Sequence, residues 1–534
     1  MVKIDFRTKR TQINSRGNSQ IVRNFSGLQK TQIEADKQSF ADMALVENMI
    51  HKGANSVLRN GMQKLKQVPD LLGVVIHETP TENYLYAYAK DGSTTSKLVE
   101  VDRVSGDLTD KVTGIPGQGA PSYCSRNGYF YLANGGTQIT EYDRSSDTAL
   151  GVSSGVTYKY VNTDGSRIWF VKNDGDEDLL GFSRKSVLGA VSSLTGGGTA
   201  LLRAGISESS IINFTSLSAS GEVIMASSAD KIEFFRIPDF SRNGVTTFED
   251  DVPLRIDGAT ITNLGIESQN NLLVVGGTAY VVSRDSVLYA IPVGSNNYKV
   301  LRDNQLQMDD FQYDQVAMGY DHQKNLLLIS CRNGSANDRI VCYNILENNF
   351  SLFTNVFASQ FTNDADNLYY VGRSNYVIEA LKDGTYSDDG IPIQAKVRTQ
   401  INDFGTLERY KVVTKLFYNV EYNENLTVTN AIYVDRGING AFSPSYTKQV
   451  PLIQNSDNYL SSPQIFGNGL LGACAFDTED YPTEVLSTSE RVNLSGVRFE
   501  AELTASSSSR FSIRGIGLTA QQTSRESNTI TYTN

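Results

Sequence analysis

The chain has 534 residues and a formal net charge of −11, and its 40% hydrophobic content excludes a wholly disordered protein. Three His and four Cys leave little for metal ligation or His-based acid–base catalysis. Tyr (27), Phe (23) and Gly (44) are plentiful, which favours strands joined by tight turns. We therefore predict an all-β protein.

The sequence shows no sign of export or membrane insertion. Its first residues lack the apolar core of a signal peptide, and no stretch approaches the ~18–20 apolar residues of a membrane span. The cysteines, at 124, 331, 342 and 474, form no CxxC pair and are expected to be buried thiols, although Cys331 and Cys342 could face each other across a hairpin.

Charge is unevenly distributed along the chain. Residues 1–66 contain 12 Lys and Arg against 5 Asp and Glu, whereas the other 468 residues contain 36 against 54. This basic arm is either a solvated terminus or a segment that docks onto an acidic partner. In the second interpretation its contacts are Lys9, Arg10, Arg16 and Arg23.

Residues 1–66 are predicted to form a small mixed segment with one helix. Phe40–Ile50 places its apolar residues near one helical face, which predicts that helix. Short extended pieces are expected at Gln20–Phe25 and Ser56–Arg59, followed by an Asn60-Gly61 turn.

Residues 67–390 repeat one texture, in which a turn residue precedes a short aromatic or aliphatic run, then a loop and a second run. Seven such anchors, from Asn83 to Asn367, have a mean spacing of about 47 residues. That spacing is typical of a four-stranded propeller blade. We predict a β-propeller of six or seven blades, with a sandwich or solenoid as the alternatives that the period leaves open.

Residues 391–534 lose this rhythm and show longer strands. Arg409–Tyr422 and Arg498–Leu503 alternate apolar and polar residues, as half-buried strands do. Long loops are expected at Gly437–Thr447 and Asn455–Glu484. A C-terminal β-sandwich-like domain is the natural architecture.

No segment carries a recognisable catalytic, cofactor or metal motif. The acidic stretch Asn173–Asp178 does not fit an EF-hand loop, because Leu179 and Lys185 stand where Gly and Glu are required. Thr195–Thr199 is Gly-rich but lacks the Lys and Ser/Thr of a phosphate loop. We expect no catalytic, cofactor-binding or metal residues and no enzymatic activity, although distant carboxylates could still converge as in a glycoside hydrolase or lyase.

Both ends of the chain resemble a known family. The runs Glu47-Asn48-Met49-Ile50 and Leu58-Arg59-Asn60-Gly61, with Arg409-Tyr410-Lys411 and Phe511-Ser512-Ile513-Arg514-Gly515-Ile516 near the other end, are similar to the tail nozzle proteins of short-tailed bacteriophages. These are also called packaged-DNA stabilisation or tail hub proteins. The usual Arg-Pro-Gly of the entry turn is here Arg59-Asn60-Gly61, without Pro.

The resemblance implies a structural virion protein of the phage tail, assembled in the cytoplasm of the host bacterium. It implies a homo-hexamer below the portal and adaptor that retains packaged double-stranded DNA, conducts it without sequence specificity during ejection, and anchors tail fibres or receptor-binding proteins. The loop Asn455–Glu484 is then a candidate gate. The alternatives are a carbohydrate- or receptor-binding propeller of a tail appendage and, after it, a propeller hydrolase or lyase.

Overall fold

The structure is a computed structural model and describes most of the chain. The described residues are 18–22, 27–28, 42–52, 55–153, 156–182 except 164, 166, 167, 175 and 176, 199–201, 213–216, 223–236, 254–255, 260–283, 287–301 except 293, 294 and 296, 312–333, 336–401, 404, 409–435, 444–452 and 484–526.

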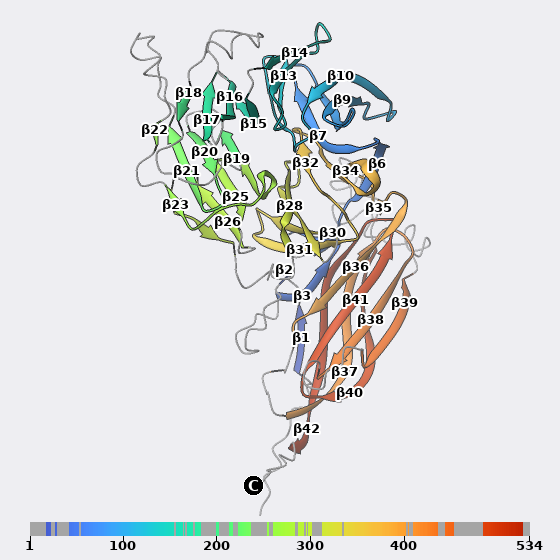
Figure 1. Cartoon of the computed structure of the whole chain (residues 1–534). Helices are drawn as coiled ribbons and strands as arrows, with labels where there is room; N and C mark the ends of the chain where they lie inside the picture. Colours follow the sequence, from blue (N-terminus) through green and yellow to red (C-terminus); the bar gives the residue numbers. More distant parts are fainter. Residues whose placement is uncertain are drawn as a thin grey trace, which may run out of the picture. The chain divides into compact units, whose positions relative to one another are not determined.

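These residues form an all-β fold (Figure 1). Their only helical elements are two short 3-10 turns, η4 (Gln269–Asn271) and η6 (Arg373–Asn375). No helix in the described part of the chain is long and apolar enough to cross a membrane.

The chain divides into two compact units. One contains Asn60–Asp389, and the other combines Met1–Arg59 with Gly390–Asn534. The predicted boundaries at 67–390 and 391–534 lie close to this division, but the predicted separate N-terminal segment at 1–66 is wrong. The division after Arg59 cuts this segment in two. Its last residues belong to the propeller unit, and the residues before them join the C-terminal part of the chain.

The unit at Asn60–Asp389 is a seven-bladed β-propeller. Each blade is an antiparallel meander, numbered here 1 to 7 in chain order. Blade 1 consists of β7 (Leu71–Glu78), β8 (Asn83–Lys90), β9 (Thr95–Val101) and β10 (Leu108–Pro116), blade 2 of β11 (Ser122–Arg126), β12 (Tyr129–Ala133), β13 (Gln138–Asp143) and β14 (Thr148–Ser153), and blade 3 of β15 (Thr157–Thr163), β16 (Ile168–Asp174), β17 (Glu177–Phe182) and β18 (Thr199–Leu201). Blade 4 consists of β19 (Asn213–Ser216), β20 (Val223–Ser227), β21 (Lys231–Arg236), β22 (Leu254–Arg255) and β23 (Ile261–Thr262), and blade 5 of β24 (Leu272–Val275), β25 (Thr278–Val282), β26 (Leu288–Pro292) and β27 (Lys299–Val300). Blade 6 consists of β28 (Gln312–Asp321), β29 (Leu326–Asn333), β30 (Ala336–Asn344) and β31 (Asn349–Thr354), and blade 7 of β32 (Phe361–Asn363), β33 (Leu368–Val371), β34 (Tyr376–Lys382) and β6 (Gly61–Gln67).

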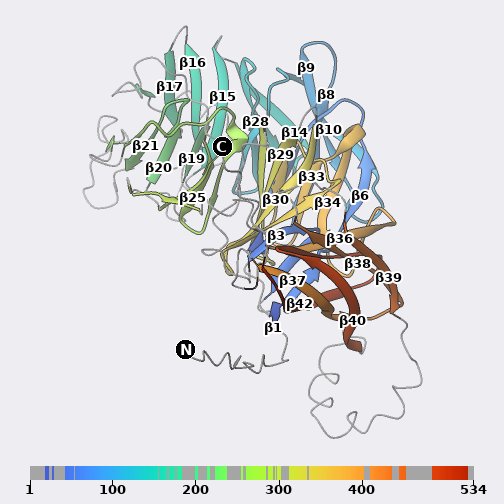
Figure 2. The same cartoon turned by 90° about the horizontal axis from the view of Figure 1, so that it is seen from below.

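Blade 7 is completed by the first strand of the unit. Strand β6 pairs with β34 in antiparallel register, and β33, β34 and β6 lie side by side in Figure 2. The backbone N–H of Gly61 donates to the Thr385 carbonyl at 2.6 Å, and that of Asp389 donates to the Met62 carbonyl at 3.0 Å. The two ends of the propeller are thereby joined, which closes the ring.

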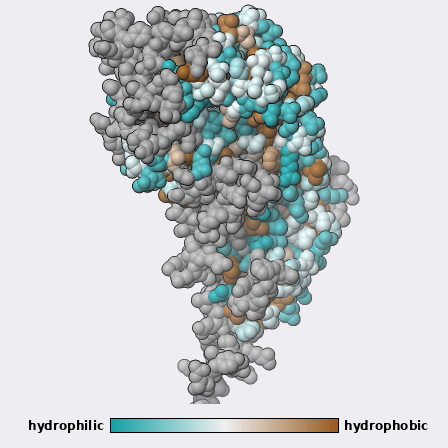
Figure 3. Space-filling view, viewed as in Figure 1, coloured by the Kyte–Doolittle hydropathy of each residue, from teal (hydrophilic) through white to brown (hydrophobic). Residues whose placement is uncertain are grey.

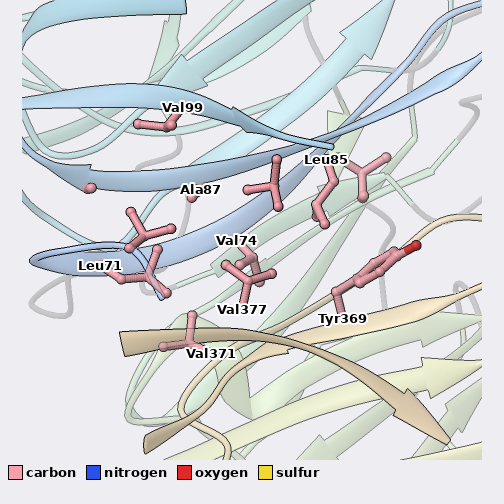
Figure 4. Close-up of a cluster of buried hydrophobic side chains, with 12 residues drawn as sticks. Leu71, Val74, Leu85, Ala87, Val99, Tyr369, Val371 and Val377 are labelled. Carbon is pink, nitrogen blue, oxygen red and sulfur yellow. The ribbon is translucent and has the colours of Figure 1, made fainter. Parts of the chain in front are cut away.

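Buried apolar side chains fill the space between neighbouring blades. Figure 4 shows the cluster between blades 7 and 1, where Val74 of blade 1 lies close to Val377 of blade 7. Further clusters join blade 1 to 2, blade 2 to 3 and blade 4 to 5. Because these strands are covered on both faces, their sequences are continuously apolar instead of alternating.

One turn sequence recurs at the hairpins of the propeller. In this sequence a Tyr is followed directly by Asp or Asn. A second Asp or Asn, five residues after the Tyr, has the left-handed backbone conformation. The tyrosine hydroxyl donates to the side-chain oxygen of that second residue, in the pairs Tyr142–Asp147, Tyr320–Asn325 and Tyr343–Asn348 at 2.6, 2.8 and 2.9 Å, with φ of 52°, 55° and 51°. Asp and Asn tolerate this conformation better than other non-glycine residues, which explains the sequence.

The second unit is a β-sandwich made from both ends of the chain. One sheet has the order β4 (Met49–Lys52), β5 (Asn55–Leu58), β42 (Phe511–Glu526), β37 (Arg409–Tyr422) and β40 (Glu484–Gly496), with β1 (Asn18–Val22) on β42. The other has the order β2 (Gly27–Leu28), β3 (Asp42–Glu47), β36 (Ile391–Thr399), β41 (Phe499–Ser507), β38 (Leu426–Val434) and β39 (Tyr446–Leu452).

The predicted helix at Phe40–Ile50 is wrong. The described part of this segment forms β3 and β4, separated by Asn48 in the left-handed conformation with φ 57°. Met43 and Val46 are fully buried because β3 pairs with β36, about 350 residues further along the chain. The predicted Asn60-Gly61 turn is wrong as well, since Gly61 begins β6.

Candidate interaction surface

The propeller carries the net negative charge of the whole chain. Asn60–Asp389 contains 26 Lys and Arg against 40 Asp and Glu, a formal net charge of −14, whereas the residues of the other unit have a net charge of +3. The acidic body predicted from the sequence is therefore the propeller and not the sandwich.

Acidic residues concentrate on one face of the propeller. In a four-stranded meander the turn between the first and second strands and the turn between the third and fourth strands lie at the same end. We call the set of these turns the acidic turn face. Its exposed acids in the described residues are Glu78, Glu82, Asp102, Asp107, Asp147, Glu347 and Asp366, from blades 1, 2, 6 and 7.

Some of these acids stabilise the turns that carry them. Asp102 Oδ1 accepts the backbone N–H groups of Val104 and Ser105 at 2.8 and 2.7 Å, and these bonds lower the pKa of its carboxyl group. In blade 6 Asn344 occupies the equivalent place and accepts from Leu346 and Glu347, each at 3.1 Å. A neutral Asn therefore suffices for this turn, so turn geometry alone does not require the negative charge.

Three half-buried cations lie at this face, and each is held by an acid. Arg103 binds Asp364 of blade 7 at 2.7 Å, and Lys324 binds Asp383 at 2.8 Å. Arg144 forms a bidentate pair with Glu100 of blade 1, at 2.7 and 2.9 Å. Among the described residues, the turns of blades 1, 2, 6 and 7 at this face expose acids but no Lys or Arg, whereas Arg236 of blade 4 and Lys299 of blade 5 are exposed at strand ends of the same face.

The acidic face also carries exposed aliphatic side chains. Val104 is 98% exposed and Leu346 is 73% exposed, at equivalent third-to-fourth-strand turns of blades 1 and 6. In the space-filling view, where blades 1 and 2 lie, hydrophilic and neutral residues predominate and hydrophobic ones are scattered (Figure 3). A partner for this face would be basic, with small apolar contacts at these turns.

Side chains cross the axis of the propeller between blades that are not neighbours. The hydroxyl groups of Tyr123 in blade 2 and Thr362 in blade 7 are hydrogen-bonded. Gln269, at the start of blade 5, donates to the Pro121 carbonyl at the start of blade 2 at 3.5 Å. Between the adjoining blades 7 and 1, Gln360 exchanges two hydrogen bonds with the backbone of Val74, at 3.1 and 3.4 Å. The axis is therefore occupied at this level.

The remaining sequence-predicted features have structural roles or lie outside the described residues. Asp178, from the acidic stretch at 173–178, accepts Lys159 at 2.8 Å and Asn173 at 3.1 Å; residues 175 and 176 of that stretch are not described. No cluster of three or more His, Cys, Asp or Glu that could hold a metal ion occurs among the described residues. Most of the predicted gate loop Asn455–Glu484 and the basic residues Lys9, Arg10, Arg16 and Arg23 lie outside them.

The cysteines that are described are buried free thiols at 124, 331 and 342. Strands β29 and β30 do form a hairpin, but Cys342 pairs with Leu328 and Cys331 pairs with Arg339. The two cysteines are therefore not directly opposite each other. Burial raises the pKa of the Cys124 and Cys331 thiols, which keeps them protonated and unreactive.

Of the comparisons with known proteins, only the one with solved structures found similar chains. No family model matches the chain, and no curated protein matches it. Among solved structures it is similar to the β-propeller domain of Cps50 (Swd1) from Myceliophteria thermophila, at 10% identity and TM-score 0.42, covering 59% of this chain and 99% of that one. It is also similar to the computationally designed protein Ika8, at 12% identity and TM-score 0.38, covering 66% and 99%. The protein is a β-propeller protein. The blade count comes from the sheet order described above.

Proposed function

We propose that this protein is a structural subunit of the tail nozzle of a short-tailed bacteriophage. Six copies form a conduit that retains packaged DNA and conducts it during ejection. The observation that carries the proposal is the segregation of charge, with −14 on the propeller and seven exposed acids at one face of blades 1, 2, 6 and 7. A wall of this kind repels the phosphate backbone, so DNA passes along it without being bound.

The occupied propeller axis favours a conduit formed between copies. The Gln269–Pro121 contact joins blades 5 and 2, on opposite sides of the ring, and so narrows the passage through a single chain. A ring of copies avoids this limit because its central passage is bounded by outer surfaces.

The residues that carry the family resemblance have structural roles in the sandwich. Arg59 is fully buried and its Nε donates to Asn48 Oδ1 at 3.1 Å, while Asn48 Nδ2 donates to the Gln394 carbonyl at 2.7 Å. This network fixes the backbone of Asn48 between β3 and β4 and ties it to β36. Motifs of this kind suit an assembly subunit, since they define a shape and not a reaction.

The proposal is tested by DNA retention. Virions assembled from the same genome without this protein should lose packaged DNA to added nuclease, and adding the purified chain to the portal–adaptor complex should restore protection. Nuclease-resistant DNA in virions that lack the protein would overturn the proposal. Binding of the chain to glycans, with no effect on DNA retention, would support the receptor-binding alternative instead.

A further inference from the structure

Two cations lie directly opposite each other on the outer face of the sandwich sheet that contains β37 and β40. Lys415 of β37 is the register partner of Arg491 of β40, and both side chains are exposed. Like charges at directly opposite positions destabilise a sheet. Neither residue has an ion-pair partner among the described residues, so nothing described in the chain offsets this repulsion.

A β-bulge places Lys415 on this face. Val413 and Leu416 are both fully buried. Between them stand two residues instead of one, the half-buried Thr414 and the exposed Lys415, so the regular alternation of buried and exposed residues is broken here. The pairing of β37 with β42 shifts between Val413 and Lys415, which identifies Thr414 as the extra residue. Without the bulge Lys415 would share the inward face of Val413. Bulges often re-aim a side chain toward a functional surface.

We propose that Lys415 and Arg491 are the contact for the acidic turn face of a second copy of this chain. This inference rests on the proposed function, because it names the interface that would hold the ring together. The two surfaces are complementary in charge. One presents two cations without an ion-pair partner among the described residues, and the other presents seven exposed acids on blades 1, 2, 6 and 7, whose described turns at this face expose no Lys or Arg.

The contact is heterologous, since a patch on the sandwich meets a different patch on the propeller of the next copy. Heterologous contacts generate closed rings when the rotation between copies closes. A contact that relies on opposite charges also fixes which faces meet, because like-charged surfaces repel. The exposed Val104 and Leu346 at the turn tips add small apolar contacts.

The first test reverses the charge of the cation pair. The double variant Lys415→Glu and Arg491→Glu should assemble at least about a hundredfold more weakly than wild type by mass photometry, since a favourable pair becomes a repulsive one. Lys52→Glu is the matched control, an exposed cation of the same unit. It should leave assembly unchanged, and the melting temperature of both variants should stay near that of wild type.

The second test restores complementarity between two defective variants. The triple variant Asp107→Lys, Glu347→Lys and Asp366→Lys makes the acidic face basic and should also fail to assemble alone. Mixed in equal amounts with the Lys415→Glu, Arg491→Glu variant, it should form rings again, because each reversed surface now meets an opposite charge. Failure of this rescue, with both variants folded, would overturn the inference.

Other outcomes separate this inference from the proposed function. A wild-type chain that forms no ring contradicts the proposed function. Rings that persist in the Lys415→Glu, Arg491→Glu variant overturn the interface alone. If DNA were the partner of this pair, the variant would keep its ring and lose affinity for short duplex DNA. If acids of residues 453–483 were the partner, the ring would persist and the melting temperature would fall.

Discussion

Arg144 of blade 2 holds Glu100 of blade 1 in a bidentate ion pair, with Nη1–Oε2 at 2.7 Å and Nη2–Oε1 at 2.9 Å. The same guanidinium group lies 3.4 Å from the ring centre of Tyr84 and donates to the Tyr86 hydroxyl at 3.2 Å. Arg103 of blade 1 makes the equivalent contacts with blade 7, since it forms an ion pair with Asp364 and its guanidinium group lies over the ring of Tyr369. An Asp-Arg dipeptide at the end of a third strand therefore joins a blade to the one before it.

We expect Arg144→Ala to destabilise the propeller by about 2–3 kcal/mol, since a charge-assisted pair and a cation–π contact are lost and Glu100 stays partly buried. The measurement is urea unfolding of the full chain followed by the fluorescence of Trp169, the one Trp of the sequence, which is fully buried in blade 3. Lys97→Ala, which removes the more exposed Lys97–Asp110 pair, is the control and should cost less than about 1 kcal/mol. Equal losses in both variants would contradict the role assigned to Arg144.

The recurring tyrosine turns should respond to the residue in the left-handed conformation. Asn348→Ala removes the acceptor of the Tyr343 hydroxyl and places a residue that disfavours φ 51° there, so we expect a loss of about 1–2 kcal/mol. Asn348→Gly keeps the backbone free and should lose only the hydrogen bond. Fluorescence-detected unfolding separates the two, and a glycine variant less stable than the alanine variant would disprove the conformational argument.

His77 should make the propeller less stable as the pH falls. Burial lowers the pKa of this imidazole to about 4, against an ordinary value of 6.5, and its Nε2 lies 3.0 Å from the Gly128 carbonyl. The unfolded chain takes up a proton below pH 6.5 and the folded chain does so only near pH 4, so stability present at pH 7 is lost between these values. The loss by pH 5 is about 2 kcal/mol. In His77→Phe the stability difference between pH 7.5 and 5 should shrink by that amount, and an unchanged difference would show that other groups cause it.

Gly61→Ala tests the closure of the ring. A Cβ atom at this position would lie 2.0 Å from the Ser387 carbonyl oxygen, which is backbone and cannot give way cheaply. We expect β6 to detach from β34 and the propeller to unfold at markedly lower urea concentration. Hydrogen exchange of the β34 amides should rise with it, whereas Lys64→Ala, which removes the exposed pair with Asp389 and the contact with the Tyr376 ring but keeps the backbone pairing, should leave these amides protected. Protected amides in Gly61→Ala would show that the closure tolerates the added methyl group.

The sequence predicts the propeller better than the N-terminal segment, for a physical reason. The anchors such as Gly128 and Asn325 precede strands whose partners lie within the same blade, so local turns and apolar runs determine them. Six of the seven anchors introduce a second strand of a blade, whereas Asn271 introduces the first strand of blade 5. The mean spacing still identifies the repeat because every blade has the same length scale.

Strands β3 and β4 could not be found in this way, whereas the extended piece predicted at Ser56–Arg59 corresponds to β5. Strand β3 pairs with β36, more than 340 residues away, and β4 pairs with β5, which itself joins the distant β42. No local pattern therefore distinguishes a strand from a helix at Met43, Val46 and Ile50. Lys415 was likewise hidden, because an alternating pattern places it beside Val413 and only the bulge at Thr414 turns it outward. The tyrosine turns, by contrast, carry a readable signal in the spacing of Tyr142 and Asp147.

If six copies of this chain form a ring, mass photometry of the purified protein with negative-stain imaging should detect it. We expect a species of about 352 kDa, six times 58.7 kDa, with a central opening, whose population falls at high salt as charged contacts are screened. A chain that stays at 58.7 kDa over the accessible concentration range, and also in the presence of the portal–adaptor complex, would contradict it.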